Sequence, residues 1–148
     1  MADALNKKCV AISTLEAIAE GLAPLGGILC PVMDARRNQV YNALFRAEKG
    51  NLSRICEDRA ISLQELGQQL ENLHEPIYLV GDGSVLTANT LPGLILPGEH
   101  RRHQRAAGVA LVAAEKIAAG EVADAAALEP NYLRLSQAER EKLEKNKL

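Results

Sequence analysis

Three strand-like stretches follow one another in the first half of the chain, and this run constrains the fold more than any other feature of the sequence. The first, residues 28–33, is continuously apolar, and the second, residues 39–47, carries apolar residues at close to period two. The third, residues 52–61, alternates between its two faces, and short turns at 34–38 and 49–51 join the three. The pattern predicts three antiparallel strands, with the mixed faces of the third placing it at a sheet edge.

Helical segments with capping signals flank these strands. Residues 9–12 form a short strand-like apolar run, and Ser13 and Glu16 then have the spacing of a capping box, which predicts a helix over residues 15–22. The same spacing recurs at Ser62 and Glu65. It precedes a stripe of leucines at helical spacing, which comprises Leu63, Leu66, Leu70 and Leu73.

The second half of the chain alternates short strands with helices. Residues 77–80 predict a central strand, 84–90 a helical turn, 94–96 a further short strand, and 99–119 a long helix that Gly120 ends. This order of elements belongs to the α/β class. We expect one face of the long helix to pack closely on a neighbour through the stripe Ala106, Val109, Ala110, Ala113 and Ile117.

Composition limits the classes of partner. The 148 residues are 47% hydrophobic and 24% charged with a net charge of −2, which predicts one soluble domain without a global field for nucleic acid or anionic lipid. Any contact with RNA must therefore be local. Only 3% of the residues are aromatic, which argues against a platform on which single-stranded nucleic acid stacks.

The cysteines point to a reducing compartment. Cys9, Cys30 and Cys56 form no CxxC pair, and their odd number without a secretion signal favours the cytoplasm, with each thiol acting as a small buried hydrophobe. The apolar stretches are interrupted well before the roughly twenty residues that a membrane span needs.

Two turns are candidate sites with open alternatives. The hairpin tip at residues 34–37 carries Asp34, Arg36 and Arg37, and it is either an anion- or partner-docking tip or a solvated turn, which its composition favours. The segment at residues 81–84 places Gly81 and Gly83 around an aspartate, so it is either a weak phosphate loop or, as the acidic residue favours, a plain strand-to-helix turn.

The only dense basic cluster lies at residues 99–105. Arg101, Arg102 and Arg105 are possible contacts for an anion or RNA phosphate, although cations at a predicted helix start oppose the helix dipole. His100 and His103 make a poor metal site and are more simply solvated. The sequence contains no recognised catalytic signature, so we predict neither a catalytic residue, nor a metal, nor a cofactor.

Four short blocks, taken together and in order, resemble the bacterial TsaB (YeaZ) family. Residues 10–17 are similar to its "vSTLEAlA" block, and residues 31–41 to its "pvmDARRgeVY" hairpin. Residues 80–83 resemble its "vGdG" turn and residues 130–134 its closing "P.YLR". The positions that match these motifs are Asp34, Arg36, Arg37, Tyr41, Gly81, Gly83, Pro130, Tyr132 and Arg134.

The resemblance implies an actin-like, RNase H-like fold with a mixed sheet. Residues 136–148 carry charges of both signs, which predicts a charged tail in the form of a frayed helix. The resemblance makes residues 1–135 the C-terminal half of the fold, without the N-terminal half of the family fold. It implies a non-catalytic scaffold, an inactive paralogue of the glycoprotease-like (peptidase M22) enzyme TsaD.

The same resemblance implies the partners. In the family, TsaD, with TsaE, transfers threonylcarbamoyl to the adenosine beside the anticodon of tRNAs, and TsaB supports it with indirect tRNA contact. The surface for TsaD is expected mainly on the N-terminal half. We also expect a homo-oligomer, because apolar surface left uncovered is usually buried by a partner or a second copy.

Two alternative functions remain open from the sequence. The first is a glycoprotease-like or nucleotide-hydrolysing enzyme that uses Asp34 or Asp82. The sequence shows neither the metal-ligand pair nor the phosphate loop that would support such an enzyme. The second is a self-associating structural domain.

Overall fold

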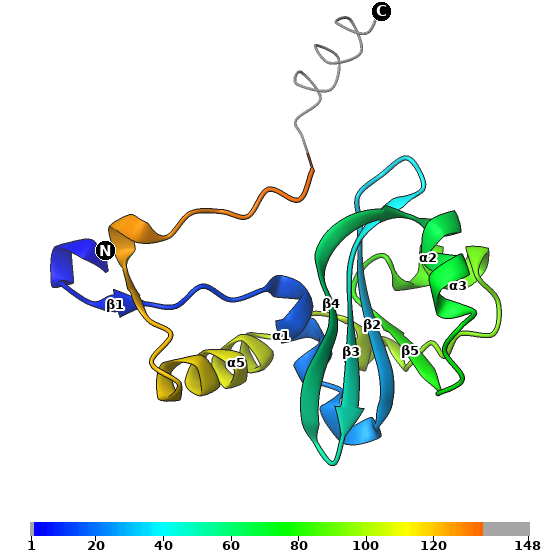
Figure 1. The fold of residues 1–148 in the computed structure, drawn as a ribbon, viewed down its shortest axis with the longest axis horizontal. Helices are drawn as coiled ribbons and strands as arrows, with labels where there is room; N and C mark the ends of the chain where they lie inside the picture. Colours follow the sequence, from blue (N-terminus) through cyan, green and yellow to red (C-terminus); the bar gives the residue numbers. More distant parts are fainter. Residues whose placement is uncertain (1, 135–148) are drawn as a thin grey trace, which may run out of the picture.

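A four-stranded mixed sheet organises the protein, with helices on both of its faces (Figure 1). The computed structural model describes residues 2–134, so the predicted charged tail at 136–148 lies outside the described residues. The α-helices are α1 (Thr14–Glu20), α2 (Leu63–Leu70), α3 (Ser84–Thr90), α4 (Glu99–Arg102) and α5 (Ala106–Ala118). The strands are β1 (Lys8–Cys9), β2 (Gly27–Asp34), β3 (Gln39–Glu48), β4 (Asn51–Ser62), β5 (Ile77–Val80) and β6 (Ala123–Asp124). Three 3-10 helices complete the elements at Asp3–Leu5, Ala23–Leu25 and Ala125–Ala127.

The sheet has the order β4-β3-β2-β5. β2, β3 and β4 are successively antiparallel, which confirms the three predicted strands, and β4 lies at the predicted edge. β5 pairs in parallel with β2. The prediction that β5 is central is wrong for the described strands, because its other side carries only a single bridge between Tyr78 and Ile95. The strand predicted at residues 94–96 is therefore reduced to this single bridge at Ile95.

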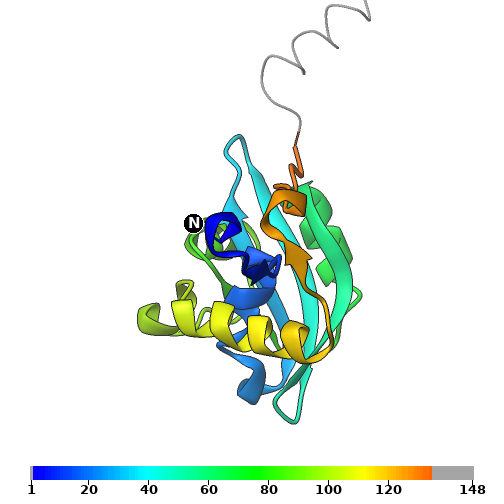
Figure 2. The ribbon, with the colours of Figure 1, turned by 90° about the vertical axis from the view of Figure 1, so that its left-hand side faces the viewer.

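The alternation of side chains along β2 builds a core on each face of the sheet. Ile28, Cys30 and Val32 are fully buried toward the leucines of α2, while Leu29 packs with the apolar face of α1. Figure 2 shows α1 and α5 together on one side of the sheet. The sheet is therefore covered on both faces, which explains why β2 reads as a continuous apolar run.

The capping signals place the helix starts correctly. The Ser62 side chain accepts the backbone N–H of Glu65, and the Glu65 carboxylate accepts the backbone N–H of Ser62, so the complete capping box begins α2. The Ser62 hydroxyl also donates to the Glu65 carboxylate at 2.7 Å, and this hydrogen bond, followed by the one from the Ser62 backbone N–H, lowers the pKa of Glu65. Ser13 likewise accepts from the Glu16 N–H at the start of α1, which ends at Glu20 rather than at residue 22.

The strand predicted at residues 9–12 is largely wrong. Only Lys8 and Cys9 pair, in a separate two-stranded sheet with β6. An ion pair between Lys8 and Asp124 at 2.7 Å accompanies this pairing. A partner more than a hundred residues away decides where the strand forms, and local hydrophobicity does not reveal it.

The single helix predicted over residues 99–119 is divided into α4 and α5. In a continuous helix the Arg102 carbonyl would accept the N–H of Ala106, but here it accepts the N–H of Gly81 at 2.6 Å. His103 and Arg105 adopt extended backbone geometry between the two helices. A tertiary hydrogen bond thus overrides the helical pattern. No helix in the described part of the chain is long and apolar enough to span a membrane.

The face of α5 that packs inward also differs from the prediction. Gly108 and Val112 are buried, whereas Val109 and Ile117 of the expected stripe are 41% and 57% exposed. A Cβ atom at position 108 would lie 2.1 Å from the carbonyl oxygen of Ala17, so only glycine permits this contact between α5 and α1. Close backbone approach occurs as expected, through a residue outside the predicted stripe.

The turn after β5 packs directly on the backbone of β2. Gly81 has a φ of +96°, and a Cβ atom there would lie 2.2 Å from the Val32 carbonyl oxygen. That oxygen accepts the N–H of Gly83 at 3.1 Å. The two glycines therefore allow the turn to contact β2 where a side chain would prevent it.

We expect Gly81→Ala to lower the free energy of unfolding by roughly 3 kcal/mol, because it combines a positive φ with a backbone clash. Gly93→Ala is the matched control, since its φ is +87° with nothing within 4 Å of the added Cβ atom. It should cost only about 1 kcal/mol. Denaturant unfolding measures both, and equal losses would contradict the close contact between Gly81 and Val32.

Candidate functional site

A cleft of about 850 Å³ brings together three of the four sequence blocks. Residues 11–16 form one side, Met33 and Tyr41 of the β2–β3 hairpin contribute from the sheet, and residues 128–134 close it. The closing segment, orange in Figure 1, runs back toward this hairpin after α5 and β6. Segments far apart in the sequence thus meet at one site.

The polar residues of the first block bind the edge strand. The Ser13 hydroxyl donates to Asp58 at 2.6 Å while it accepts from the Glu16 N–H. Arg54 of β4 donates to Asp58 at 2.7 Å and to Glu16 at 3.2 Å. A single guanidinium therefore connects the first turn of α1 to β4 and pairs with both carboxylates of the cluster.

The environment of Arg54 keeps it charged. Burial lowers its pKa, but the hydrogen bond that it donates to Asp58 and the charges of Asp58, Glu16 and Glu57 together raise the pKa above its ordinary value. The guanidinium also lies 4.6 Å from the centre of the Phe45 ring, within the range of a cation–π contact. Sequence analysis missed Arg54 and Asp58 as members of this cluster, and their shared face in the alternation of β4 was the only signal for them.

The tip of the β2–β3 hairpin has an unusual backbone. Arg36, Arg37 and Asn38 have φ values of 62°, 56° and 56°, so three successive residues are left-handed. Asparagine tolerates this region, but arginine does so poorly, and each such residue costs about 1 to 2 kcal/mol. Strain of this kind is retained only where the surrounding structure imposes it.

Four contacts hold the tip in this geometry. Asp34 accepts the N–H of Arg36 at 2.7 Å, and Asp82 accepts the N–H of Asp34 at 3.2 Å. The Asn38 carbonyl accepts the N–H of Leu63 at 3.0 Å at the start of α2. The fourth contact comes from Arg134, whose guanidinium donates to the Ala35 carbonyl. The hairpin, the glycine turn and the closing block therefore meet at one strained loop.

The remaining motif positions fall into two groups. Gly81 and Gly83 place the Asp82 turn against β2, as described above. Tyr41 is half-buried in the cleft, while Pro130 is exposed and Tyr132 is 84% exposed. The glycines therefore shape the backbone of the site, whereas Tyr41, Pro130 and Tyr132 contribute side chains that solvent reaches.

The phosphate-loop alternative at residues 81–84 does not fit the geometry. The Gly81 N–H is taken by the Arg102 carbonyl and the Gly83 N–H by the Val32 carbonyl. A phosphate cradle needs such N–H groups free to point at the anion. The segment is the plain strand-to-helix turn that its sequence favours.

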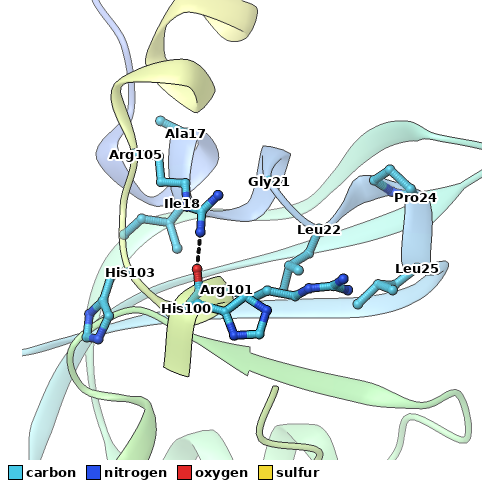
Figure 3. A pocket seen from close by; sticks show the side chains of 10 residues that line it. All are labelled: Ala17, Ile18, Gly21, Leu22, Pro24, Leu25, His100, Arg101, His103 and Arg105. Carbon is cyan, nitrogen blue, oxygen red and sulfur yellow. Dashed lines mark hydrogen bonds between the residues drawn. The ribbon is translucent and has the colours of Figure 1, made fainter. Parts of the chain in front are cut away.

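The basic cluster is not brought together as one site. Arg101 and Arg105 line a pocket of about 470 Å³ with His100, His103 and apolar residues near α1, but Arg102 does not line it (Figure 3). The Arg105 side chain donates to the His100 carbonyl, and Arg101 extends toward Leu25. A role of these arginines in binding an anion stays a prediction.

Reactive groups of other kinds are likewise not assembled. Among residues 2–134, no group of three or more histidine, cysteine or acidic side chains could hold a metal ion. Cys30 is the small buried hydrophobe that was predicted, and burial raises its pKa to about 12. The same prediction is wrong for Cys9 and Cys56, which are only half-buried.

The fold and the cleft define an α/β domain of the RNase H-like, actin-like class. Two solved structures share it: an uncharacterized protein with similarity to peptidase YeaZ from Pseudomonas aeruginosa, and YeaZ from Pseudomonas aeruginosa. Their TM-scores are 0.72 and 0.70 at 20% and 19% identity, over 90% and 88% of this chain and 62% of each of theirs. Sequence comparison then identifies the family.

The model of the family described as "TsaD: tRNA N6-adenosine threonylcarbamoyltransferase" matches residues 1–142, and the chain belongs to this family. A curated relative, the tRNA threonylcarbamoyladenosine biosynthesis protein TsaB of Bacillus subtilis (strain 168), is 30% identical over 142 residues. The match covers 93% of this chain and 60% of the relative. The chain thus spans about three fifths of the length of the proteins it resembles.

We expect Arg54→Ala to lower the free energy of unfolding by about 2 kcal/mol, because it leaves two part-buried carboxylates without their cation. Arg46→Ala is the control, since Arg46 also pairs with a carboxylate, that of Glu75, but both side chains are largely exposed. Its loss should be much smaller. Chemical denaturation compares the two, and equal losses would show that the cluster does not stabilise α1 on β4.

Proposed function

We propose that this chain acts as a non-catalytic scaffold domain in the formation of threonylcarbamoyladenosine in tRNA. The family match over residues 1–142 and the similarity to a biosynthesis protein support the pathway. The observation that carries the scaffold role is the use of the motif side chains. Ser13, Glu16, Asp82 and Arg134 bind distant parts of this chain, and Asp34 binds the backbone of its own loop.

The same use of side chains disfavours the enzymatic alternative. A nucleotide-hydrolysing or glycoprotease-like mechanism through Asp34 or Asp82 needs a carboxylate free to accept a proton or bind a metal. Each of the two instead accepts a backbone N–H that holds the hairpin tip. Their geometry supports a structural role.

The partner in this proposal is a TsaD-type threonylcarbamoyltransferase, with TsaE as a further component. We base it on the description of the matched family and on the printed name of the relative. The domain would then contribute to catalysis by holding the transferase in its active assembly. Its contact with tRNA would be secondary to that of the enzyme.

Self-association is a second candidate because α5 leaves several apolar side chains exposed. Val109, Leu111 and Ile117 are 41%, 53% and 57% exposed, and Val122 beyond the helix is 43% exposed. Apolar surface of this kind is usually covered in solution. Light scattering over a wide concentration range should detect a homo-oligomer, and a monomer at every concentration would exclude it.

Complementation tests the main proposal. Cells depleted of their own TsaB and supplied with this chain should regain the modified nucleoside, measured by mass spectrometry of their tRNA. The Asp82→Asn variant separates the alternatives, because a scaffold should keep most of its activity while a catalytic carboxylate should not. No recovery with folded, soluble chain would contradict the function, and ATP turnover by the purified chain that Asp82→Asn abolishes would favour an enzyme.

A further inference from the structure

The tip of the β2–β3 hairpin carries two cationic side chains, those of Arg36 and Arg37, that the proposed scaffold role does not explain. Arg36 and Arg37 are both exposed, and neither forms an ion pair with any carboxylate in the part of the chain that the structure describes. We propose that these two arginines bind neighbouring phosphates of an RNA backbone. This inference rests on the proposed function, which brings a tRNA to the assembly.

The exposed residues of the tip are Asp34, Arg36, Arg37 and Asn38. The backbone N–H of Arg36 is taken by Asp34, and the carbonyl of Arg36 accepts the N–H of Gln39 at 3.2 Å. Ala35 is buried, and its carbonyl binds Arg134. The two arginines therefore supply the positive charge among the exposed residues of the tip.

The strain at the tip supports a binding role. Arg36 and Arg37 both have positive φ, a conformation that glycine or asparagine adopts with less strain. Retaining two arginines in this conformation is more typical of a functional loop than of a solvated turn. The four contacts from Asp34, Asp82, Leu63 and Arg134 fix the loop before any ligand arrives. Fixing the loop in advance reduces the entropy that binding would otherwise lose.

The chemistry of the tip fits a phosphate backbone better than a protein surface. A guanidinium donates two parallel hydrogen bonds to a phosphate and keeps its charge at every physiological pH. A stable protein interface needs an apolar or aromatic centre, but the only apolar residue of the loop, Ala35, is buried. Since the whole chain has a net charge of −2, attraction to RNA must come from a local site of this kind.

Salt-dependent RNA binding tests the inference. The full chain is titrated with an unmodified tRNA transcript between 50 and 200 mM salt, and fluorescence anisotropy gives the affinity. Arg36→Gln/Arg37→Gln should weaken binding by on the order of tenfold at low salt, and it should reduce the slope of log K against log salt by about two.

The control removes the same charge elsewhere. Lys7→Gln/Lys49→Gln also deletes two exposed cations, and Lys49 lies in the turn between β3 and β4, at the other end of β3 from the tip. It should leave the slope nearly unchanged. Circular dichroism confirms that both variants fold, since none of the four side chains is buried.

Three results would overturn the inference. They are no tRNA binding by the wild-type chain at 50 mM salt, an unchanged slope in the arginine variant, or an equal loss in the lysine variant. If the arginine variant keeps RNA binding but loses association with the transferase, the tip binds protein instead. Recovery of the modified nucleoside in depleted cells by a chain that binds no RNA would reject this inference alone and leave the proposed function standing.

Discussion

The contact between the glycine turn after β5 and the backbone of β2 is the constraint on which the rest of the structure depends. Because Gly81 and Gly83 carry no side chain, the turn reaches the Val32 carbonyl and aligns β5 beside β2. The same turn places Asp82 under the hairpin, where it accepts the N–H of Asp34. The Gly81 N–H also donates to the Arg102 carbonyl, and this hydrogen bond separates α4 from α5. One close backbone approach thus influences the sheet, the hairpin tip and the helices together.

Local features of the sequence predicted the parts of the fold that local interactions determine. The three antiparallel strands, the edge position of β4 and the capping box at Ser62 all form as expected, because periodicity and caps act over a few residues. The misplaced elements depend on distant partners. β1 forms only where β6 lies, the helix over residues 99–119 is divided by a hydrogen bond from Gly81, and α5 turns its Gly108 face inward to meet Ala17. None of these partners leaves a trace in the local pattern.

The candidate site was predictable to a similar degree. Three of the four blocks line the cleft and the fourth contacts the hairpin tip, and the resemblance that they carry agrees with the family match. The sequence of the blocks does not reveal the role of their side chains, because a serine, a glutamate or an aspartate can serve in catalysis or can stabilise the fold through hydrogen bonds. The structure shows that Ser13 and Glu16 bind β4 through Asp58 and Arg54, and that Asp34, Asp82 and Arg134 hold one strained loop. The side chains of the blocks thus stabilise the packing of α1 on β4 and the conformation of the hairpin tip, which is consistent with the proposed scaffold role.

The central claim is that these contacts impose a left-handed backbone on the hairpin tip. NMR couplings that report φ at Arg36, Arg37 and Asn38 measure this most directly, in the wild-type chain and in Asp34→Ala, which removes the acceptor of the Arg36 N–H. We predict positive φ at all three residues in the wild type, and averaged values in the variant, while the rest of the sheet keeps its spectrum. Negative φ at Arg36 and Arg37 in the wild type would contradict the claim.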